Sequence, residues 1–271
     1  MIDVKGKTAL VTGGAMGMGL LWARHFARDG ANLVLWDINA AGLEQAAEEL
    51  RGQVDVMTQV VDVSDRKQIY KAALKVQAET GGVDILVNNA GIVFSKPFLE
   101  TPDEHLSATI DVDLKALFWT MKAFMPRMLE LNASHIINIS SASGFIGVPR
   151  MPAYVASKWG VIGLTESVRL EVRGMKKDGV GFTLFCPSYV DTGMFEGAKA
   201  PLLTPMLTPD AAVRIAYDGF RDGKYMITAP WMVGLTPAIK GLLPSKLFDV
   251  VSDLFGANSS MDSWKDTRRD K

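Results

Sequence analysis

The sequence predicts a single-domain α/β fold, in which a doubly wound parallel sheet carries helices on both of its faces. Two observations predict this class. Short apolar runs alternate along the chain with segments whose apolar residues recur three and four positions apart, the spacing of an amphipathic helix. The apolar runs are also unbroken, which is typical of strands that are covered on both sides of a parallel sheet.

Six apolar runs fit strands. They occupy residues 8–12, 32–36, 56–61, 85–87, 135–139 and 180–185. Helical patterns lie between them, for example over residues 40–51 and 65–79. Because strands and helices alternate, the crossovers should be right-handed and the strands parallel.

No internal repeat or low-complexity linker interrupts this alternation, so residues 1–260 are expected to form one domain. Residues 187–209 contain four prolines and few strand formers, which predicts a long loop beside the substrate. Residues 230–256 are apolar and are interrupted by three prolines, and they are expected to form a C-terminal extension. Residues 261–271 are charged and are expected to be a flexible tail.

The charge balance is close to neutral, with 29 Lys and Arg against 30 Asp and Glu, and gives no electrostatic reason to expect a nucleic-acid partner. Cys186 is the single cysteine, which excludes an internal disulfide and a cysteine-rich zinc site; its apolar neighbours predict a buried strand thiol, and no metal is expected. The first strand begins too early to leave room for a signal peptide, and no apolar run reaches about 18 residues. We therefore expect a cytoplasmic protein without stable membrane insertion.

A glycine-rich segment joins the first strand to a helical pattern over residues 20–29. Its candidate cofactor-binding residues are Gly13, Met16, Gly17 and Gly19. Glycines permit a tight turn there and let the backbone approach a pyrophosphate, while the helix N-terminus offers free N–H groups and a partial positive charge. The position of this segment between a strand and a helix predicts a dinucleotide site and a sheet of the Rossmann type.

Asp37 ends the second expected strand. A carboxylate at this place can accept hydrogen bonds from the adenosine ribose, and it would repel the 2′-phosphate of NADP. No Lys or Arg stands in the glycine loop or at positions 38–39 to neutralise such a phosphate. NAD is therefore the expected cofactor; the competing explanation of Asp37 is a turn residue or a helix cap.

Tyr154 and Lys158 are four residues apart in a segment with helical periodicity over residues 153–173, so both side chains can point into one cleft. A nearby lysine cation favours the phenolate, and we expect it to lower the pKa of Tyr154 from about 10 towards neutrality. Such a phenol can donate or accept a proton while a hydride arrives or leaves.

Ser141 follows the expected strand over residues 135–139, at the edge of the sheet where open α/β folds bind ligands. Its hydroxyl could hydrogen-bond the substrate oxygen and stabilise the charge that develops there. Ser140 and Ser143 are alternatives for this role, and turn capping is the competing explanation for any one serine.

The ordered set of these motifs resembles the short-chain dehydrogenase/reductase family. The resemblance extends from residue 6 to about residue 230. The matching residues are Thr12-Gly-x-x-x-Gly-x-Gly19, Asp62-Val63, Asn88-Asn-Ala-Gly91, Ser141, Tyr154-x-x-x-Lys158 and Cys186-Pro-Ser-Tyr-Val190-Asp-Thr192.

The resemblance implies a role for each matching residue. Tyr154 would be the acid/base, Ser141 would hold the substrate oxygen, and Lys158 would bind the nicotinamide ribose. The remaining residues would contact the cofactor: Asp62 and Val63 at the adenine ring, Asn88, Ala90 and Gly91 on the adenosine side, and Val190 and Thr192 at the carboxamide. The family also implies a homodimer or homotetramer, formed through residues 103–130 and 151–175.

Two positions depart from the family pattern. Ser188 stands where relatives usually have glycine, so the turn after the sixth strand can differ. Asp113 stands where many relatives have an asparagine that helps to order a water beside the catalytic lysine. We expect Asp113 to lie near Lys158, to offset part of its charge at Tyr154 and to raise the pH optimum of oxidation above that of an Asp113→Asn variant. A substitution without effect is the alternative.

The candidate substrate residues are Ser143, Phe145, Tyr189, Met194 and Phe195. Apolar and methionine-rich surroundings favour a secondary or lipophilic alcohol or its ketone, and packing of the core or of a subunit interface is the competing explanation. The C-terminal extension is similar to that of the retinol and hydroxysteroid dehydrogenase-like branch. It could cap the substrate, pack on another subunit or touch a membrane surface.

The sequence therefore predicts an NAD-dependent oxidoreductase that acts on the CH–OH group of a small-molecule alcohol. A 3-oxoacyl-thioester reductase or a general carbonyl reductase is the alternative among enzymes. A nucleotide-binding protein without chemistry is a third interpretation, which the presence of Ser141, Tyr154 and Lys158 disfavours.

Overall fold

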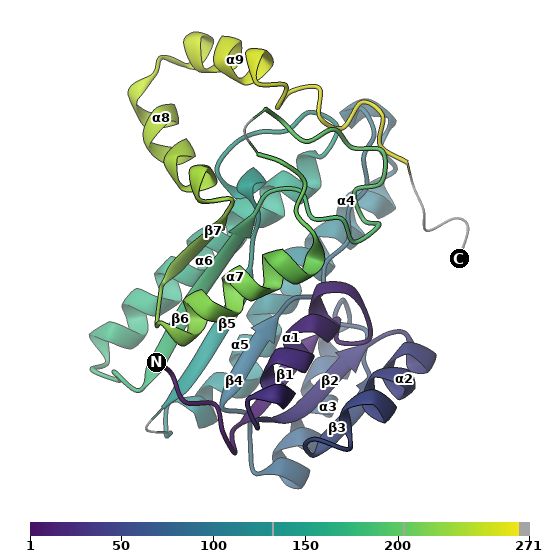
Figure 1. Ribbon diagram of the computed structural model, residues 1–271, viewed down its shortest axis with the longest axis vertical. Coiled ribbons are helices and arrows are strands. Elements are labelled where there is room, and N and C mark those ends of the chain that lie inside the picture. Colours follow the sequence, from purple (N-terminus) through teal and green to yellow (C-terminus); the bar gives the residue numbers. More distant parts are fainter. Residues whose placement is uncertain (132, 203, 266–271) are drawn as a thin grey trace.

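The computed structural model describes residues 1–131, 133–202 and 204–265. Within these residues, seven parallel strands form one sheet in the order β3–β2–β1–β4–β5–β6–β7 (Figure 1). The strands are β1 (Thr8–Thr12), β2 (Asn32–Asp37), β3 (Val56–Val60), β4 (Ile85–Asn88), β5 (Ser134–Ile139), β6 (Val180–Pro187) and β7 (Met226–Ala229). The predicted doubly wound parallel sheet is confirmed, and each of the six expected strands is present.

The two edges of the sheet differ from the prediction. β7 was not expected, because it has only four residues and begins with Met226, which is exposed. At the opposite edge, the side chain of Val60 on β3 is 60% exposed. The prediction that every strand is covered on both faces is therefore wrong for the two edge strands, β3 and β7. Each has a neighbouring strand on one side only, and each carries an exposed apolar residue.

Helices cover both faces of the sheet (Figure 1). On one face lie α1 (Gly17–Arg28), α2 (Ala40–Leu50) and α7 (Pro209–Arg221), which share a core that includes Trp22, Phe26 and Phe220. On the other lie α3 (Arg66–Thr80), α5 (Ala116–Met128) and α6 (Pro152–Gly174), whose core includes Ile69, Phe124 and Val172. α4 (Asp103–Ile110) packs against α6.

A π-helical turn, Asp111–Lys115, connects α4 to α5. It carries Asp113, whose side chain is completely buried. Single π-helical turns occur frequently at functional sites, because the extra residue re-aims a side chain. Here the turn directs an acidic side chain towards the carboxyl end of the sheet.

The chain beyond β7 leaves the layered body and then returns to it. α8 (Thr236–Leu242) and α9 (Ser245–Leu254) form an arch that stands clear of the sheet (Figure 1). None of the helices in the described ranges combines the length and the apolarity that a bilayer crossing requires. The predicted loop over residues 187–209 is present between Pro187, the last residue of β6, and Pro209, the first residue of α7; its described part has one isolated bridge, between Val190 and Leu207.

The last described residues pack against this loop. Met261 is 1% exposed, and the Lys265 N–H donates a hydrogen bond of 2.9 Å to the Glu196 carbonyl oxygen. The prediction of a flexible tail from residue 261 onwards is wrong for residues 261–265, because Met261 and Trp264 bury apolar surface in a cluster with Tyr189. Residues 266–271 lie outside the described residues.

Candidate active site

The glycine loop after β1 has the tight geometry that its sequence predicts. Gly13 and Gly17 have φ values of +67° and +54°, in the left-handed region that favours glycine. A Cβ at Gly19 would collide with the Gly13 carbonyl group and with the Asn89 side chain. Each of the three predicted glycines is therefore required by the fold of the loop.

Asp37 lies directly against this loop. Its Oδ2 accepts a hydrogen bond of 3.1 Å from the Ala15 N–H, and its Oδ1 accepts one of 3.0 Å from the Asn39 N–H. The second bond is the turn contact that was the competing explanation. The carboxylate therefore stabilises both the glycine loop and the turn after β2, and its contact with a ribose stays a prediction. Met16 has a 54% exposed side chain and contributes to the loop through its backbone, at the start of α1.

Two residues that the sequence analysis left without a role hold the loop in place. Thr12 Oγ1 accepts hydrogen bonds from the N–H groups of Asn89, at 3.0 Å, and Ala90, at 3.1 Å. Asn89 Nδ2 donates to the Thr12 carbonyl oxygen at 3.0 Å. These bonds join the ends of β1 and β4, so the segment with Ala90 and Gly91 lies beside the glycine loop. The sequence feature that could have identified Asn89 is its place in the Asn-Asn-Ala-Gly motif.

The structure places the Asn88 side chain elsewhere. It is buried, donates to Asn138 Oδ1 at 2.8 Å and accepts from Thr120 Oγ1 at 2.7 Å. Asn138 in turn donates to Thr165 Oγ1 at 2.9 Å. The Asn88 amide is therefore committed to a polar network between β4, β5, α5 and α6, so only the backbone of Asn88 is free to line the adenosine side, and that implied role stays a prediction.

The remaining residues with implied cofactor roles lie at the same edge of the sheet. Asp62, after β3, accepts hydrogen bonds from the Ser64 N–H and hydroxyl, and Val63 beside it is buried. Val190, after β6, is also buried, and the Thr192 N–H donates to its carbonyl oxygen at 2.9 Å. Each follows the carboxyl end of a strand, where ligands bind in open α/β sheets.

Ser141, Tyr154 and Lys158 come together beyond the end of β5. Ser141 caps a short 3-10 turn, Ala142–Gly144, and its Oγ accepts a hydrogen bond of 3.2 Å from the Ser143 N–H. Tyr154 and Lys158 lie on the buried face of the first turns of α6, and Lys158 Nζ is 5.3 Å from the centroid of the Tyr154 ring. Ser141 and Tyr154 also line the same cavity. The expected juxtaposition of these three side chains is present.

The two alternative serines have different surroundings. Ser140 Oγ donates to the Lys158 carbonyl oxygen at 2.8 Å, so it ties β5 to α6. Ser143 Oγ is buried and has no hydrogen-bond partner among the described residues. Ser140 is therefore a structural serine, whereas Ser143 remains a candidate to bind a substrate beside Ser141.

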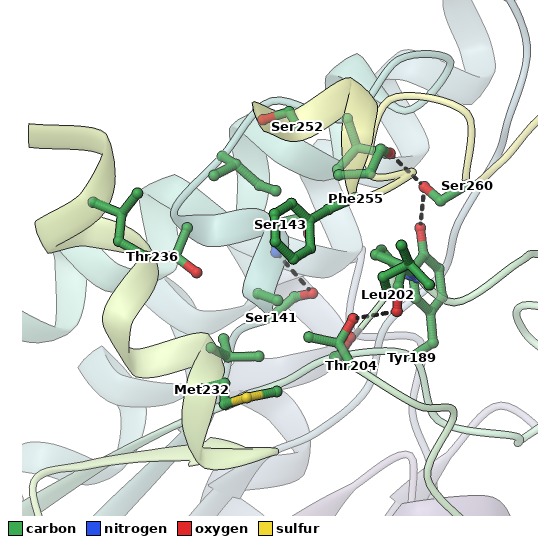
Figure 2. A pocket seen from close by; sticks show the side chains of 18 of the residues that line it. Ser141, Ser143, Tyr189, Leu202, Thr204, Met232, Thr236, Ser252, Phe255 and Ser260 are labelled. Atoms are coloured by element: carbon green, nitrogen blue, oxygen red, sulfur yellow. Dashed lines mark hydrogen bonds between the residues drawn. The ribbon is translucent and has the colours of Figure 1, made fainter. Parts of the chain in front are cut away.

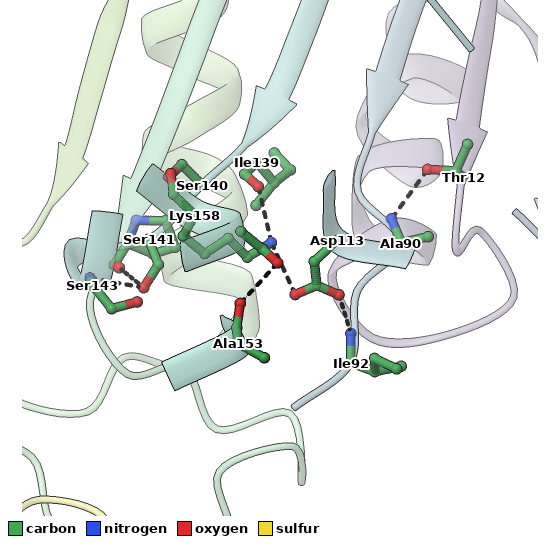
Figure 3. A network of polar contacts seen from close by, with 12 residues as sticks. Thr12, Ala90, Ile92, Asp113, Ile139, Ser140, Ser141, Ser143, Ala153 and Lys158 are labelled. Carbon is green, nitrogen blue, oxygen red and sulfur yellow. Dashed lines mark hydrogen bonds and ion pairs between the residues drawn. The ribbon is translucent and has the colours of Figure 1, made fainter. Parts of the chain in front are cut away.

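Lys158 is held by two acceptors. Its Nζ donates to the Ile139 carbonyl oxygen at 3.2 Å and forms an ion pair of 3.5 Å with Asp113 Oδ2 (Figure 3). Asp113 Oδ1 accepts a hydrogen bond of 2.8 Å from the Ile92 N–H. The prediction that Asp113 lies near Lys158 is confirmed.

The direction in which the protein shifts the pKa of Tyr154 differs from the prediction. Burial raises the pKa of Tyr154 above its ordinary value, and the negative charge of Asp113 raises it further, while the hydrogen bond with Ser141 opposes this shift. The expected lowering of the pKa of Tyr154 is therefore wrong for the protein groups alone, because burial of the phenol, together with the negative charge of Asp113, outweighs the opposing effect of Ser141.

One cavity of about 280 Å³ opens at Ser141 and Tyr154. Of the candidate substrate residues, Ser143 and Tyr189 line it (Figure 2), and so does Phe195. Phe145 and Met194 do not line this cavity. The Phe145 side chain packs in a core cluster with Leu117, Val161, Leu184 and Cys186, and Met194 packs behind Tyr189 and Phe195.

The far wall of the cavity comes from the C-terminal extension, from which no substrate residue was chosen. Met232 and Phe255 line it there (Figure 2), together with Ile239 and Val251. Of the three explanations of this extension, a cap over the substrate is the one that the described contacts support. The sequence feature that pointed to this wall was the apolar composition of residues 230–256, but composition does not show which of these residues face the cavity.

Cys186 and the other metal-binding residue types do not form a metal centre here. In the described part of the chain, no group of three or more His, Cys, Asp or Glu side chains could hold a metal ion. Cys186 is fully buried on β6, as predicted, and burial raises the pKa of its thiol to about 12. A thiol with this pKa is neutral at physiological pH and is a poor nucleophile.

Curated relatives share most of this chain. It is 38% identical to Retinol dehydrogenase 10-A of Danio rerio, over 96% of this chain and 85% of the relative. It is also 38% identical to Epidermal retinol dehydrogenase 2 of Homo sapiens, over 98% and 88%, and to Estradiol 17-beta-dehydrogenase 11 of Macaca fascicularis, over 92% and 83%.

Solved structures with the same fold include proteins with either nicotinamide cofactor. A short chain dehydrogenase/reductase from Burkholderia phymatum in complex with NAD superposes with a TM-score of 0.81 at 24% identity, over 93% of this chain and 97% of that one. A short-chain dehydrogenase from Sphingobium yanoikuyae in complex with NADPH superposes with a TM-score of 0.77 at 26% identity, over 91% and 96%.

The family profile described as short chain dehydrogenase matches residues 7–202. This range contains the glycine loop, Asp113, Ser141, Tyr154 and Lys158, and it extends into the loop after β6. Together with the relatives above, this match shows that the chain belongs to the short chain dehydrogenases, a family of oxidoreductases, in the branch of the retinol and hydroxysteroid dehydrogenases.

Proposed function

We propose that this chain is an NAD-dependent oxidoreductase that moves a hydride between the nicotinamide and a secondary or lipophilic alcohol or the corresponding carbonyl compound. The observation that carries the proposal is the position of the apolar cavity, which is lined by both Ser141 and Tyr154. A substrate seated in it has its oxygen beside two hydroxyl groups and its carbon skeleton among aliphatic and aromatic side chains.

The residues at the ends of β1 and β2 fit a dinucleotide. α1 begins at Gly17 without a side-chain cap and without an acidic residue in its first turn, an arrangement that suits a pyrophosphate at the helix N-terminus. Asp37 suits the ribose hydroxyls of NAD, and its charge disfavours the 2′-phosphate of NADP. When bound, NAD supplies the hydride acceptor and NADH the hydride donor.

Tyr154 moves the proton in this proposal. Its hydroxyl gives a proton to the oxygen of a ketone that is being reduced, or takes one from an alcohol that is being oxidised. Ser141 donates a hydrogen bond to the same oxygen and stabilises the charge on it. Lys158 stays in place through the Ile139 carbonyl group and Asp113, and it binds the nicotinamide ribose.

The cavity favours a bulky substrate without charge. Among the described residues that line it, none is Lys, Arg, His, Asp or Glu. A 3-oxoacyl thioester carries phosphate groups on its carrier, and this cavity offers them no cation. A lipophilic alcohol in the class of retinol or estradiol, after which the relatives are named, is therefore better supported than a thioester.

Initial rates test this proposal. The protein is assayed at the nicotinamide absorbance band with NAD, NADP, NADH and NADPH, against alcohols and ketones that increase in size from propan-2-ol to retinol and a hydroxysteroid. We expect the highest kcat/KM with NAD and the large apolar alcohols. Rates that are higher with NADPH and a 3-oxoacyl thioester would favour the reductase alternative instead.

Tyr154→Phe tests the acid/base within the same assay. We expect kcat to fall by about 100-fold or more, because the ring stays in place but has no proton to transfer, while NADH affinity stays close to wild type. Tyr70→Phe on α3 is the matched control and should leave kcat unchanged. Wild-type rates in Tyr154→Phe, or cofactor binding without turnover of any substrate, would contradict the proposal.

A further inference from the structure

A buried carboxylate is paired with the lysine of the active site. Asp113 Oδ2 lies 3.5 Å from Lys158 Nζ, and the Asp113 side chain is 0% exposed. Its other oxygen accepts the hydrogen bond from the Ile92 N–H, which fixes the direction of the carboxylate (Figure 3). Asp113 Oδ2 has no hydrogen-bond partner among the described residues, so the ammonium is the group that compensates its charge.

The pair is expected to be ionised. A buried carboxylate without a partner is costly, and burial raises the pKa of Asp113. The positive charge of Lys158 and the N–H of Ile92 oppose this shift, and the distance of 3.5 Å is typical of an ion pair. Removal of either partner would leave an uncompensated charge in the interior.

Few other titratable groups face this pair and Tyr154. The Tyr189 hydroxyl approaches Tyr154 from the loop after β6, and the Cys186 thiol approaches Lys158 from β6 itself. Burial raises the pKa of both groups, so both stay neutral at physiological pH. The two charges that act on Tyr154 are therefore those of Lys158, on its own helix, and of Asp113, on the π-helical turn.

We propose that Asp113 is a positioning residue that neutralises Lys158 and thereby keeps Tyr154 in its protonated, proton-donating form up to alkaline pH. The inference rests on the proposed function, in which Tyr154 transfers the proton. An asparagine at this position could keep the bond with the Ile92 N–H but would carry no charge, so Lys158 would lose the group that neutralises it.

The pH dependence of kcat/KM in both directions tests the proposal. Oxidation of an alcohol should rise with pH as Tyr154 loses its proton, and reduction of the ketone should fall over the same range. In Asp113→Asn we expect both midpoints to move to lower pH by about one unit, because a negative charge near the phenol is removed. If Asp113→Asn changed only the stability of the protein or its affinity for the substrate, the rates would fall but the two midpoints would not move together.

Asp111→Asn is the matched control. Asp111 lies on the same π-helical turn, but its carboxylate pairs with Lys115 at the surface, at 2.7 Å. The Asp111→Asn substitution removes one negative charge from the same segment but does not change the surroundings of Lys158. Both midpoints should therefore stay at their wild-type values. Midpoints in Asp113→Asn that equal those of wild type and of Asp111→Asn would overturn the proposal.

A second measurement needs neither turnover nor the variant at position 113. The phenolate absorbance of Tyr154 is titrated without cofactor, as the difference between the wild-type protein and Tyr154→Phe. We expect ionisation above about pH 10, the value of a free tyrosine, and ionisation below it would overturn the proposal even if Asp113→Asn does not fold. If the protein turns over no alcohol or ketone, the proposed function fails, and this titration still shows whether Tyr154 keeps its proton up to alkaline pH.

Discussion

The Tyr189 hydroxyl donates a hydrogen bond of 2.8 Å to Ser260 Oγ, and Ser260 Oγ donates one of 2.7 Å to the Ala257 carbonyl oxygen. These bonds join the loop after β6 to the segment that follows α9. Tyr189 and Ser260 both line the cavity, and Met261 packs in one cluster with Tyr189 and Tyr154. The wall of the cavity next to Tyr154 therefore depends on residues 257–261.

Ser260→Ala should weaken this wall. The change leaves the Tyr189 hydroxyl buried without its acceptor, which costs about 1–3 kcal/mol of folding free energy. We expect KM for a large apolar alcohol to rise several-fold with little change in kcat, because the proton-transferring groups are untouched. Steady-state kinetics with a large and a small alcohol measure this, and the exposed Ser259→Ala is the control. An unchanged KM for the large alcohol would show that the segment does not shape the cavity.

Gly19→Ala should impair cofactor binding. The new Cβ has no space, since it meets the Gly13 carbonyl group and the Asn89 amide, so the loop must move. We expect NADH affinity to fall by about tenfold or more, because the loop is the surface that the pyrophosphate approaches. NADH fluorescence titration measures the affinity.

The control for this variant is Gly163→Ala. Gly163 is exposed in the interior of α6, and a Cβ there has no neighbour within 4 Å. Alanine should raise the free energy of unfolding by about 0.5–1 kcal/mol and leave NADH affinity unchanged. Equal NADH affinity in the two variants would mean that Gly19 is not needed for the site.

Local sequence patterns were sufficient for six of the seven described strands and for the juxtaposition of Tyr154 and Lys158. Gly13, Gly17 and Gly19 are identified by a steric requirement of the backbone, and Tyr154 and Lys158 by the period of one helix. Such requirements act between residues that are close in the chain. They are therefore visible without knowledge of how distant segments pack.

The parts that were missed depend on contacts between distant segments. Asn88 pairs with Asn138 and Thr120, 50 and 32 residues away, and no local pattern shows which face of β4 a buried amide occupies. Phe145 was assigned to the substrate because it follows Ser141, but its side chain packs into the core. The far wall of the cavity depends on how the arch of α8 and α9 returns over the sheet, which composition alone does not determine.

Asp37→Asn should change the cofactor preference. Asparagine can keep the hydrogen bond with the Ala15 N–H, so the loop stays in place, but the charge that opposes a 2′-phosphate is lost. We expect the ratio of kcat/KM for NAD to that for NADP to fall by about tenfold, a change of about 1.4 kcal/mol. Asp55→Asn, which removes an exposed charge before β3, should keep the wild-type ratio. A wild-type ratio in Asp37→Asn would assign Asp37 to the turn alone.

His135 should make the fold sensitive to acid. It is 5% exposed on β5, its Nε2 lies 2.9 Å from Thr183 Oγ1, and burial lowers the pKa of its imidazole from 6.5 to about 4. Between these values the unfolded chain binds a proton that the folded chain does not, so the free energy of unfolding falls as the pH falls, by about 3 kcal/mol at pH 4. Above pH 6.5 the imidazole is neutral in both states, and this effect is absent.

His135→Gln removes the titrating group and can keep a polar contact with Thr183, so its unfolding free energy should depend less steeply on pH between 6.5 and 4. Urea unfolding at a series of pH values measures this slope. His105→Asn, which replaces a histidine of α4 outside the core, is the control and should keep the wild-type slope. The prediction concerns the slope and not the absolute stability, because a buried substitution changes the packing at every pH. Curves for wild type and His135→Gln that run parallel from pH 6.5 to 4 would mean that His135 takes up its proton in the folded protein as readily as in the unfolded chain.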